Sequence, residues 1–173
     1  MRRLPALCLV LTGLFSPVPT TAQAGNAGGG VAAHYSHRTA RMHAAGTFQV
    51  TVKPTDVSEV GKAAGLGRMT IDKVWSGAIE GASKGEMTTS AVGTTMVYVA
   101  LETMTVKVNG RSGSFVFAHK ATMNSTDPKS GMMDISVVPD TGTGELKGIE
   151  GSLQITIDKS GHSYDFSYTL PAE

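Results

Sequence analysis

The stretch YVALETMTVKVNGRSGSFVFAH, residues 98–119, contains the strongest folding signal in the chain. Apolar and polar residues alternate on both sides of Asn109-Gly110, and alternation with a period of two is typical of half-buried strands. Asn-Gly is a preferred pair for a two-residue type I′ turn, because both central residues of that turn need positive φ. The stretch therefore predicts a β-hairpin in which Val108 faces Arg111.

The two-residue turn also sets the register of the whole hairpin, and with it the side chains that share a face. Four cross-strand pairs are predicted on one face: Met104 with Phe115, Glu102 with Phe117, Ala100 with His119, and Tyr98 with Ala121. This face carries large apolar side chains, so we expect it to be the inner one. Glu102 then points inward, and His119 is its diagonal neighbour at roughly 7–8 Å.

A carboxylate, an imidazole and a phenol would then converge on an apolar interior, and we take Glu102, His119 and Tyr98 as candidate catalytic residues. Burial raises the pKa of a carboxyl group, whereas a nearby imidazolium lowers it. Such groups suit proton transfer to or from a small apolar substrate. The alternative is a buried polar pair that sets the register of the strands and does no chemistry.

The rest of the chain alternates in the same way and predicts a protein made almost entirely of β-strands. Short helical turns are expected only within 55–65 and 144–148. Sequential strands with short connections favour an eight-stranded antiparallel up-and-down β-barrel, with a β-sandwich as the alternative. A barrel of this size is filled by side chains or holds one small ligand. The expected strands are about 46–53, 67–81, 84–93, 95–108, 111–124, 131–139, 150–158 and 162–170.

The first 24 residues have the layout of a secretory signal peptide. A basic start at Arg2-Arg3 precedes a short apolar run, and Ala22-Gln23-Ala24 supplies small residues before the expected cleavage site. We therefore expect an exported protein, periplasmic or secreted, with no membrane attachment after cleavage. The only cysteine, Cys8, would be removed, which excludes disulfides from the mature chain. Residues 25–45 are predicted to form a flexible linker and residues 46–171 a single domain.

The charge balance excludes some partners and gives no support for a cofactor. The chain has 15 basic and 14 acidic residues, so there is no basic excess to bind nucleic acid. His34, His37 and His43 lie in the predicted linker, where no carboxylate or apolar frame would orient them as metal ligands. We therefore predict neither a metal site nor a cofactor.

Three blocks of sequence resemble a known family. They are Tyr98 to Glu102, Gly110 to Phe115 with His119, and Val138-Pro-Asp-Thr-Gly-Thr-Gly144 followed by Gly148-Ile-Glu-Gly151. Together they resemble the bacterial domain-of-unknown-function family 3224, over about residues 45–170. The resemblance implies the barrel fold of allene oxide cyclase, which is shared more distantly with dirigent proteins. It does not imply the cyclase reaction, and the family has no agreed activity to carry over.

The sequence is compatible with three functions. The first is binding of a small, mostly apolar ligand in the barrel lumen, lined by Trp75, Met104, Phe115, Phe117, Tyr164 and Tyr168. The second is an isomerase, cyclase or lyase that uses Glu102 and His119. The third is a structural or interaction barrel with a filled core. On the opposite face of the hairpin, Val97, Val99 and Leu101 form an apolar patch that predicts a homo-oligomer.

Overall fold

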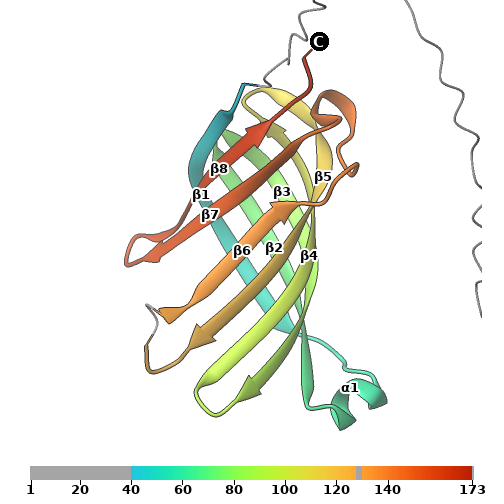
Figure 1. The fold of residues 1–173 in the computed structure, drawn as a ribbon, viewed down its shortest axis with the longest axis vertical. Coiled ribbons are helices and arrows are strands. Elements are labelled where there is room, and N and C mark those ends of the chain that lie inside the picture. The colour runs from blue at the N-terminus through green and yellow to red at the C-terminus, as the bar shows by residue number, and fades with distance from the viewer. Residues whose placement is uncertain (1–39, 128–129, 173) are drawn as a thin grey trace, which may run out of the picture. The chain divides into compact units, whose positions relative to one another are not determined.

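The chain folds into a closed antiparallel β-barrel of eight strands (Figure 1). The structure, a computed structural model, describes residues 40–127 and 130–172. The predicted signal peptide at 1–24 lies outside the described residues, as does the linker up to residue 39 with His34 and His37. The elements are β1 (Met42–Pro54), α1 (Glu59–Ala63), β2 (Leu66–Gly77), β3 (Ile79–Val92), β4 (Thr95–Val108), β5 (Arg111–Asn124), β6 (Met132–Val137), the 3-10 helix η2 (Gly144–Leu146), β7 (Glu150–Asp158) and β8 (Gly161–Thr169).

Each strand pairs with the next one along the chain, and β8 returns to pair with β1. This arrangement confirms the predicted up-and-down barrel and excludes the sandwich. Closure leaves no free edge in the sheet of the described residues, which is one way in which β-proteins avoid edge-to-edge aggregation. Both short helical turns are found where the sequence predicts them, at Glu59–Ala63 and Gly144–Leu146.

The hairpin of β4 and β5 has the predicted register at every pair. Val108 lies opposite Arg111, and the ladder continues without a bulge to Thr95 and Asn124. Asn109 has φ of 47° and Gly110 has φ of 83°, as a type I′ turn requires. Because the ladder is regular, the same face of the hairpin points into the barrel from the turn to the far end of the two strands.

The largest departures from the predicted strand boundaries are at the start of β1 and between β2 and β3. β1 begins at Met42, so the last residues of the predicted linker, including His43, belong to a strand that pairs with β8. Ala44 is fully buried there, and His43 Nδ1 lies 3.1 Å from Asp165 Oδ1. The expected break between the second and third strands at residues 82–83 is also wrong. The chain turns at Gly77, with φ of 107°, and β3 starts at Ile79.

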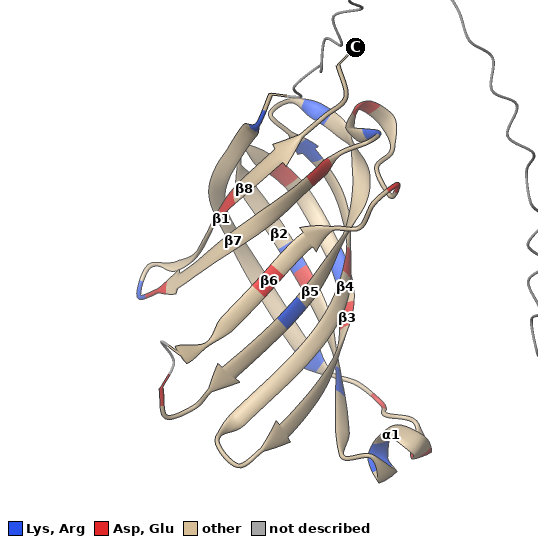
Figure 2. Ribbon diagram, in the orientation of Figure 1, with Lys and Arg blue, Asp and Glu red and all other residues tan. Residues whose placement is uncertain are grey.

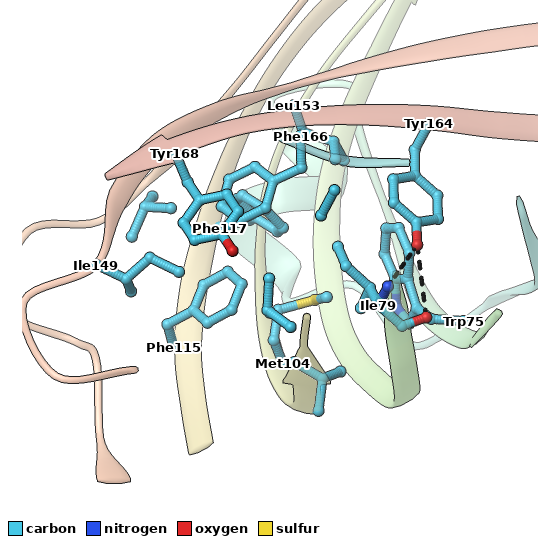
Figure 3. Close-up of a cluster of buried hydrophobic side chains, with 14 of the residues drawn as sticks. Trp75, Ile79, Met104, Phe115, Phe117, Ile149, Leu153, Tyr164, Phe166 and Tyr168 are labelled. Carbon is cyan, nitrogen blue, oxygen red and sulfur yellow. Dashed lines mark hydrogen bonds between the residues drawn. The ribbon is translucent and has the colours of Figure 1, made fainter. Parts of the chain in front are cut away.

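The hydrophobic core fills one half of the barrel, next to the turn at residues 109–110 (Figure 3). Its aromatic rings pack edge to face, stacked or tilted, with the Phe115 and Phe117 centroids 5.0 Å apart. The Tyr164 hydroxyl accepts a hydrogen bond of 2.7 Å from the Ile79 backbone N–H, which links β8 to the start of β3. Leu146 of η2 and the neighbouring Ile149 close this half, and both are fully buried.

The barrel is weakest between β6 and β7. These strands pair at a single position, Ser136 with Ser152, within the described residues. Every other pair of neighbouring strands is held by a run of at least six paired residues. β6 is also the shortest strand of the ring, Met132–Val137.

The outer wall carries mixed charge and a small apolar patch. Basic and acidic positions are interspersed along the strands (Figure 2). Val99 and Leu101 point outward as predicted and are 53% and 61% exposed. Self-association through this patch stays a prediction. Within the described residues, no helix is long and apolar enough to cross a membrane.

Replacing Gly110 with Val should destabilise the fold, because a β-branched residue resists the positive φ of this turn. We expect a loss of about 1–2 kcal/mol in the free energy of unfolding, measured by urea denaturation. The matched control is Ser112→Val, at an exposed position of β5 just after the turn. It should change the free energy of unfolding by less than about 0.5 kcal/mol. Equal stability of the two variants would contradict the assigned turn.

Candidate functional site

Glu102 lies at the centre of the barrel, with its side chain completely buried. Alternation along β4 turns its even-numbered positions inward, and Glu102 follows the same period as its buried neighbours Ala100 and Met104. Gly85 of β3 is paired with it, and a Cβ there would stand 2.9 Å from the Glu102 Cα. The glycine therefore allows β3 to approach β4 closely beside the carboxylate.

Three polar side chains from three other strands surround this carboxylate. Lys73 of β2 donates a hydrogen bond of 2.8 Å to Glu102 Oε2, and the Ser83 hydroxyl of β3 donates to Oε1. His119 Nε2 of β5 lies 2.9 Å from Oε2, although its N–H does not point along that line. Trp75 Nε1 supports Ser83 with a hydrogen bond of 2.8 Å. We call Lys73, Ser83, Glu102 and His119 the central cluster.

The central cluster keeps Glu102 ionised. Burial is the largest single influence and acts to raise the pKa of its carboxyl group. The contact with His119, the charge and hydrogen bond of Lys73 and the Ser83 hydroxyl act together against it and lower the pKa to about 2. The Lys73 ammonium also lies 4.9 Å from the ring centre of Phe48, a favourable cation–π distance.

A cavity of about 380 Å³ occupies the half of the lumen that the core leaves open. Its apolar wall comes from Phe48, Val50, Val52, Ile71, Ile155 and Ile157. It is also lined by five methionines, Met69, Met87, Met96, Met123 and Met133. Its polar groups are Lys73, Thr89, Tyr98, His119 and His162. Lys73 and His119 thus belong both to the cavity wall and to the central cluster, which separates the cavity from the filled half.

Tyr98 is the third candidate catalytic residue, and it lines the cavity on the same strand as Glu102. Its hydroxyl makes no hydrogen bond with any described residue. Burial first, and then the negative charge of Glu102, raise the pKa of the Tyr98 phenol. The hydroxyl therefore keeps its proton at neutral pH and is available as a donor.

The structure brings Glu102 and His119 into contact and places Tyr98 on the cavity that His119 also lines. Tyr98 and His119 line the cavity, whereas Glu102 lies behind them and has no face on it. The six candidate ligand-lining residues all point inward and are buried, yet none of them lines the cavity. They belong to the packed core: Trp75, Met104, Phe115, Phe117, Tyr164 and Tyr168.

Sequence reasoning missed Lys73, Ser83 and the methionines. Lys73 stands between Ile71 and Trp75 in the same alternating run, so the period of two was a signal that it points inward. The five methionines also occupy inward positions of their strands. Among the described residues, no three His, Cys, Asp or Glu side chains come together as a metal site.

A larger and more open hollow, about 870 Å³, lies on the outer side of β2 to β5. Its lining includes the charged residues Asp72, Lys84 and Glu86, and Lys84 Nζ bonds to Asp72 Oδ1 at 2.6 Å. Glu86 is paired with Arg68, so these exposed side chains already have partners. The lumen cavity, smaller but next to the buried central cluster, is the better candidate site.

Fold and site together define a closed eight-stranded antiparallel barrel with a buried charged cluster beneath a half-open lumen. Residues 44–168 match the family model described as "Protein of unknown function (DUF3224)", and the chain belongs to this family. It is similar to a crystal structure of a DUF3224 protein of unknown function from Shewanella oneidensis MR-1, with 35% identity and a TM-score of 0.67. The match covers 77% of this chain and 100% of that chain. No curated protein matches the chain.

Glu102→Gln should destabilise the protein at neutral pH by about 3 kcal/mol, because it leaves the buried Lys73 charge without its partner. The folded-state pKa of Glu102 lies below its ordinary value of 4.5, at about 2. Its contribution is therefore complete above pH 4.5 and is lost as the pH falls toward about 2. The difference in free energy of unfolding between the parent protein and Glu102→Gln, measured by urea denaturation, should therefore narrow as the pH falls from 4.5 toward about 2.

The matched control is Glu86→Gln, which changes a half-exposed carboxylate paired with Arg68 on the outer wall. Such a surface pair contributes less than about 1 kcal/mol, so this variant should stay close to the parent protein. A stability difference for Glu102→Gln that does not vary with pH would contradict an ionised, paired Glu102.

Proposed function

We propose that the barrel binds a small, mostly apolar molecule in the open half of its lumen. The observation that carries this proposal is the cavity of about 380 Å³, with largely apolar walls and a few polar groups, among them Lys73 and His119 of the central cluster. Ligand sites in proteins typically have this size and composition. We also propose, from the layout of residues 1–24, that the protein performs this role after export.

The methionines support binding rather than a filled structural barrel. A purely structural core would be packed to uniform density, as the half around Phe115 and Phe166 is. Met87, Met96 and Met123 line the open half instead, and unbranched thioether side chains adapt to irregular contacts. Such a wall suits a ligand that is recognised by its apolar surface and general shape.

The state of Glu102 favours binding over catalysis. An isomerase, cyclase or lyase of the kind considered above needs Glu102 to accept a proton from the substrate. With a pKa of about 2, this carboxylate is a weak base at neutral pH. Both of its oxygens already accept hydrogen bonds from Lys73 and Ser83, and it has no face on the cavity.

Binding can be tested with the apolar fluorophore N-phenyl-1-naphthylamine, whose emission rises in an apolar site. We expect saturable binding with one probe per barrel. Met87→Trp places an indole inside the cavity and should weaken binding at least tenfold. Val99→Trp adds the same indole to the outer wall and should leave binding unchanged.

Circular dichroism of both variants checks that the barrel is intact. Binding that survives Met87→Trp but is lost in Val99→Trp would move the site from the lumen to the outer wall. No saturable binding to the unmodified protein would contradict the proposal.

A further inference from the structure

The polar groups that reach the cavity are mainly donors without an acceptor. Within the described residues, Lys73 Nζ makes one hydrogen bond, to Glu102, although an ammonium carries three N–H groups. The Tyr98 hydroxyl makes none, and neither ring nitrogen of the buried His119 has an aligned hydrogen bond. Glu102, the strongest acceptor nearby, is already engaged and lies outside the cavity wall.

An occupant that satisfies these groups must bring acceptor atoms to the closed end of the cavity. Buried donors without a partner are unfavourable, and an acceptor on the ligand would remove that cost. The remaining wall is built from methionine, valine, isoleucine and phenylalanine side chains such as Met69, Val50 and Ile155. The complementary molecule therefore has an apolar body and one polar head.

The charges of the central cluster decide whether this head can be an anion. Lys73 and Glu102 form a buried ion pair and neutralise each other. A carboxylate entering beside them would be an uncompensated buried charge, which is strongly unfavourable. His119 and His162 are the imidazoles on the cavity wall, and His119 is the one that lies against Glu102. An imidazole can be neutral or carry one positive charge, so His119 is the group in the cluster that can supply the missing charge.

His119 is also placed to connect the ligand with the cluster. His119 Nε2 lies 2.9 Å from Glu102 Oε2. Neutral His119 with its proton on Nε2 has a lone pair on Nδ1, and protonation turns Nδ1 into a donor. Glu102 and Tyr98 on β4 and Lys73 on β2 are the ionisable groups beside it, and His162 of β8 lines the same cavity. On β6, the inward neighbours are the apolar Met133 and Ile135.

We infer that the ligand is an amphiphilic carboxylate whose headgroup is bound by Lys73, His119 and Tyr98, and that His119 takes up one proton on binding. This inference rests on the proposed function and names the chemical class of its ligand. The carboxylate stays ionised, the proton comes from solvent, and no covalent bond forms or breaks. Affinity then falls as the pH rises, because fewer protons are available to accompany the anion.

The test compares decanoate with decan-1-ol, which has the same chain length and no charge, by isothermal titration calorimetry between pH 6 and 8. Decanoate should bind at least about tenfold more tightly at pH 6, and its affinity should fall toward tenfold per pH unit as the pH rises. Decan-1-ol should show no such dependence. Titrations in phosphate and in Tris, which differ in ionisation enthalpy, should report uptake of close to one proton with decanoate.

Two variants separate the headgroup from the cavity. His119→Gln should abolish both the proton uptake and the preference for decanoate while decan-1-ol still binds. Tyr98→Phe removes one hydrogen-bond donor, so it should weaken decanoate binding a few-fold while proton uptake on binding is retained. This variant tests the headgroup site if His119→Gln fails to fold.

Each contrary result has a distinct meaning. Equal binding of both probes would overturn the carboxylate headgroup and leave the proposed function standing. Preference for decanoate without proton uptake would overturn the role of His119. Failure of both probes, together with failure of N-phenyl-1-naphthylamine, would overturn the proposed function as well.

Discussion

The buried ion pair between Glu102 and Lys73 is the constraint on which the rest of the barrel depends. The side chains of the central cluster come from β2, β3, β4 and β5, so four consecutive strands must hold their register to complete it. A slip of one residue in any of them would turn its contribution to the solvent face and leave a buried charge without a partner. The cluster therefore specifies one alignment of strands, whatever it contributes to net stability.

The same cluster divides the lumen into two parts with different properties. On one side, stacked rings such as Phe166 and Tyr168, with centroids 5.0 Å apart, form a rigid core. On the other side, methionines surround a cavity. The rigid half holds the strands and the charged groups in position, and the open half leaves space for an occupant without weakening that support. This division gives the polar groups a fixed place at the closed end of the cavity.

Much of the fold follows from local signals, whereas the contents of the lumen do not. Asn109-Gly110 determines its own turn and therefore predicted every pair of the β4–β5 hairpin, including the inward position of Glu102 and its proximity to His119. Alternation also indicates that Phe115 and Tyr168 point inward. It cannot indicate whether the space in front of them is filled, because that depends on side chains across the barrel from distant strands.

Lys73 shows the second limit of sequence reasoning. Lysine is almost always exposed, so a lysine in an alternating run is taken as an interruption rather than as a member of the inner face. Only the knowledge that a carboxylate lies on a facing strand makes its burial reasonable. The early start of β1 has a similar cause, since Ala44 and Ala45 give a weak strand signal and become a strand by pairing with β8.

The single paired position between β6 and β7 has a consequence for local opening of the barrel. Opening this seam breaks fewer main-chain hydrogen bonds than opening any other, so its amide protons should exchange with solvent ahead of those in the longer ladders. Met133 and Ile155, which line the cavity, belong to the two strands of the seam. Opening there would widen the wall of the cavity sideways, while the register of β2 to β5, which holds the central cluster, stays in place.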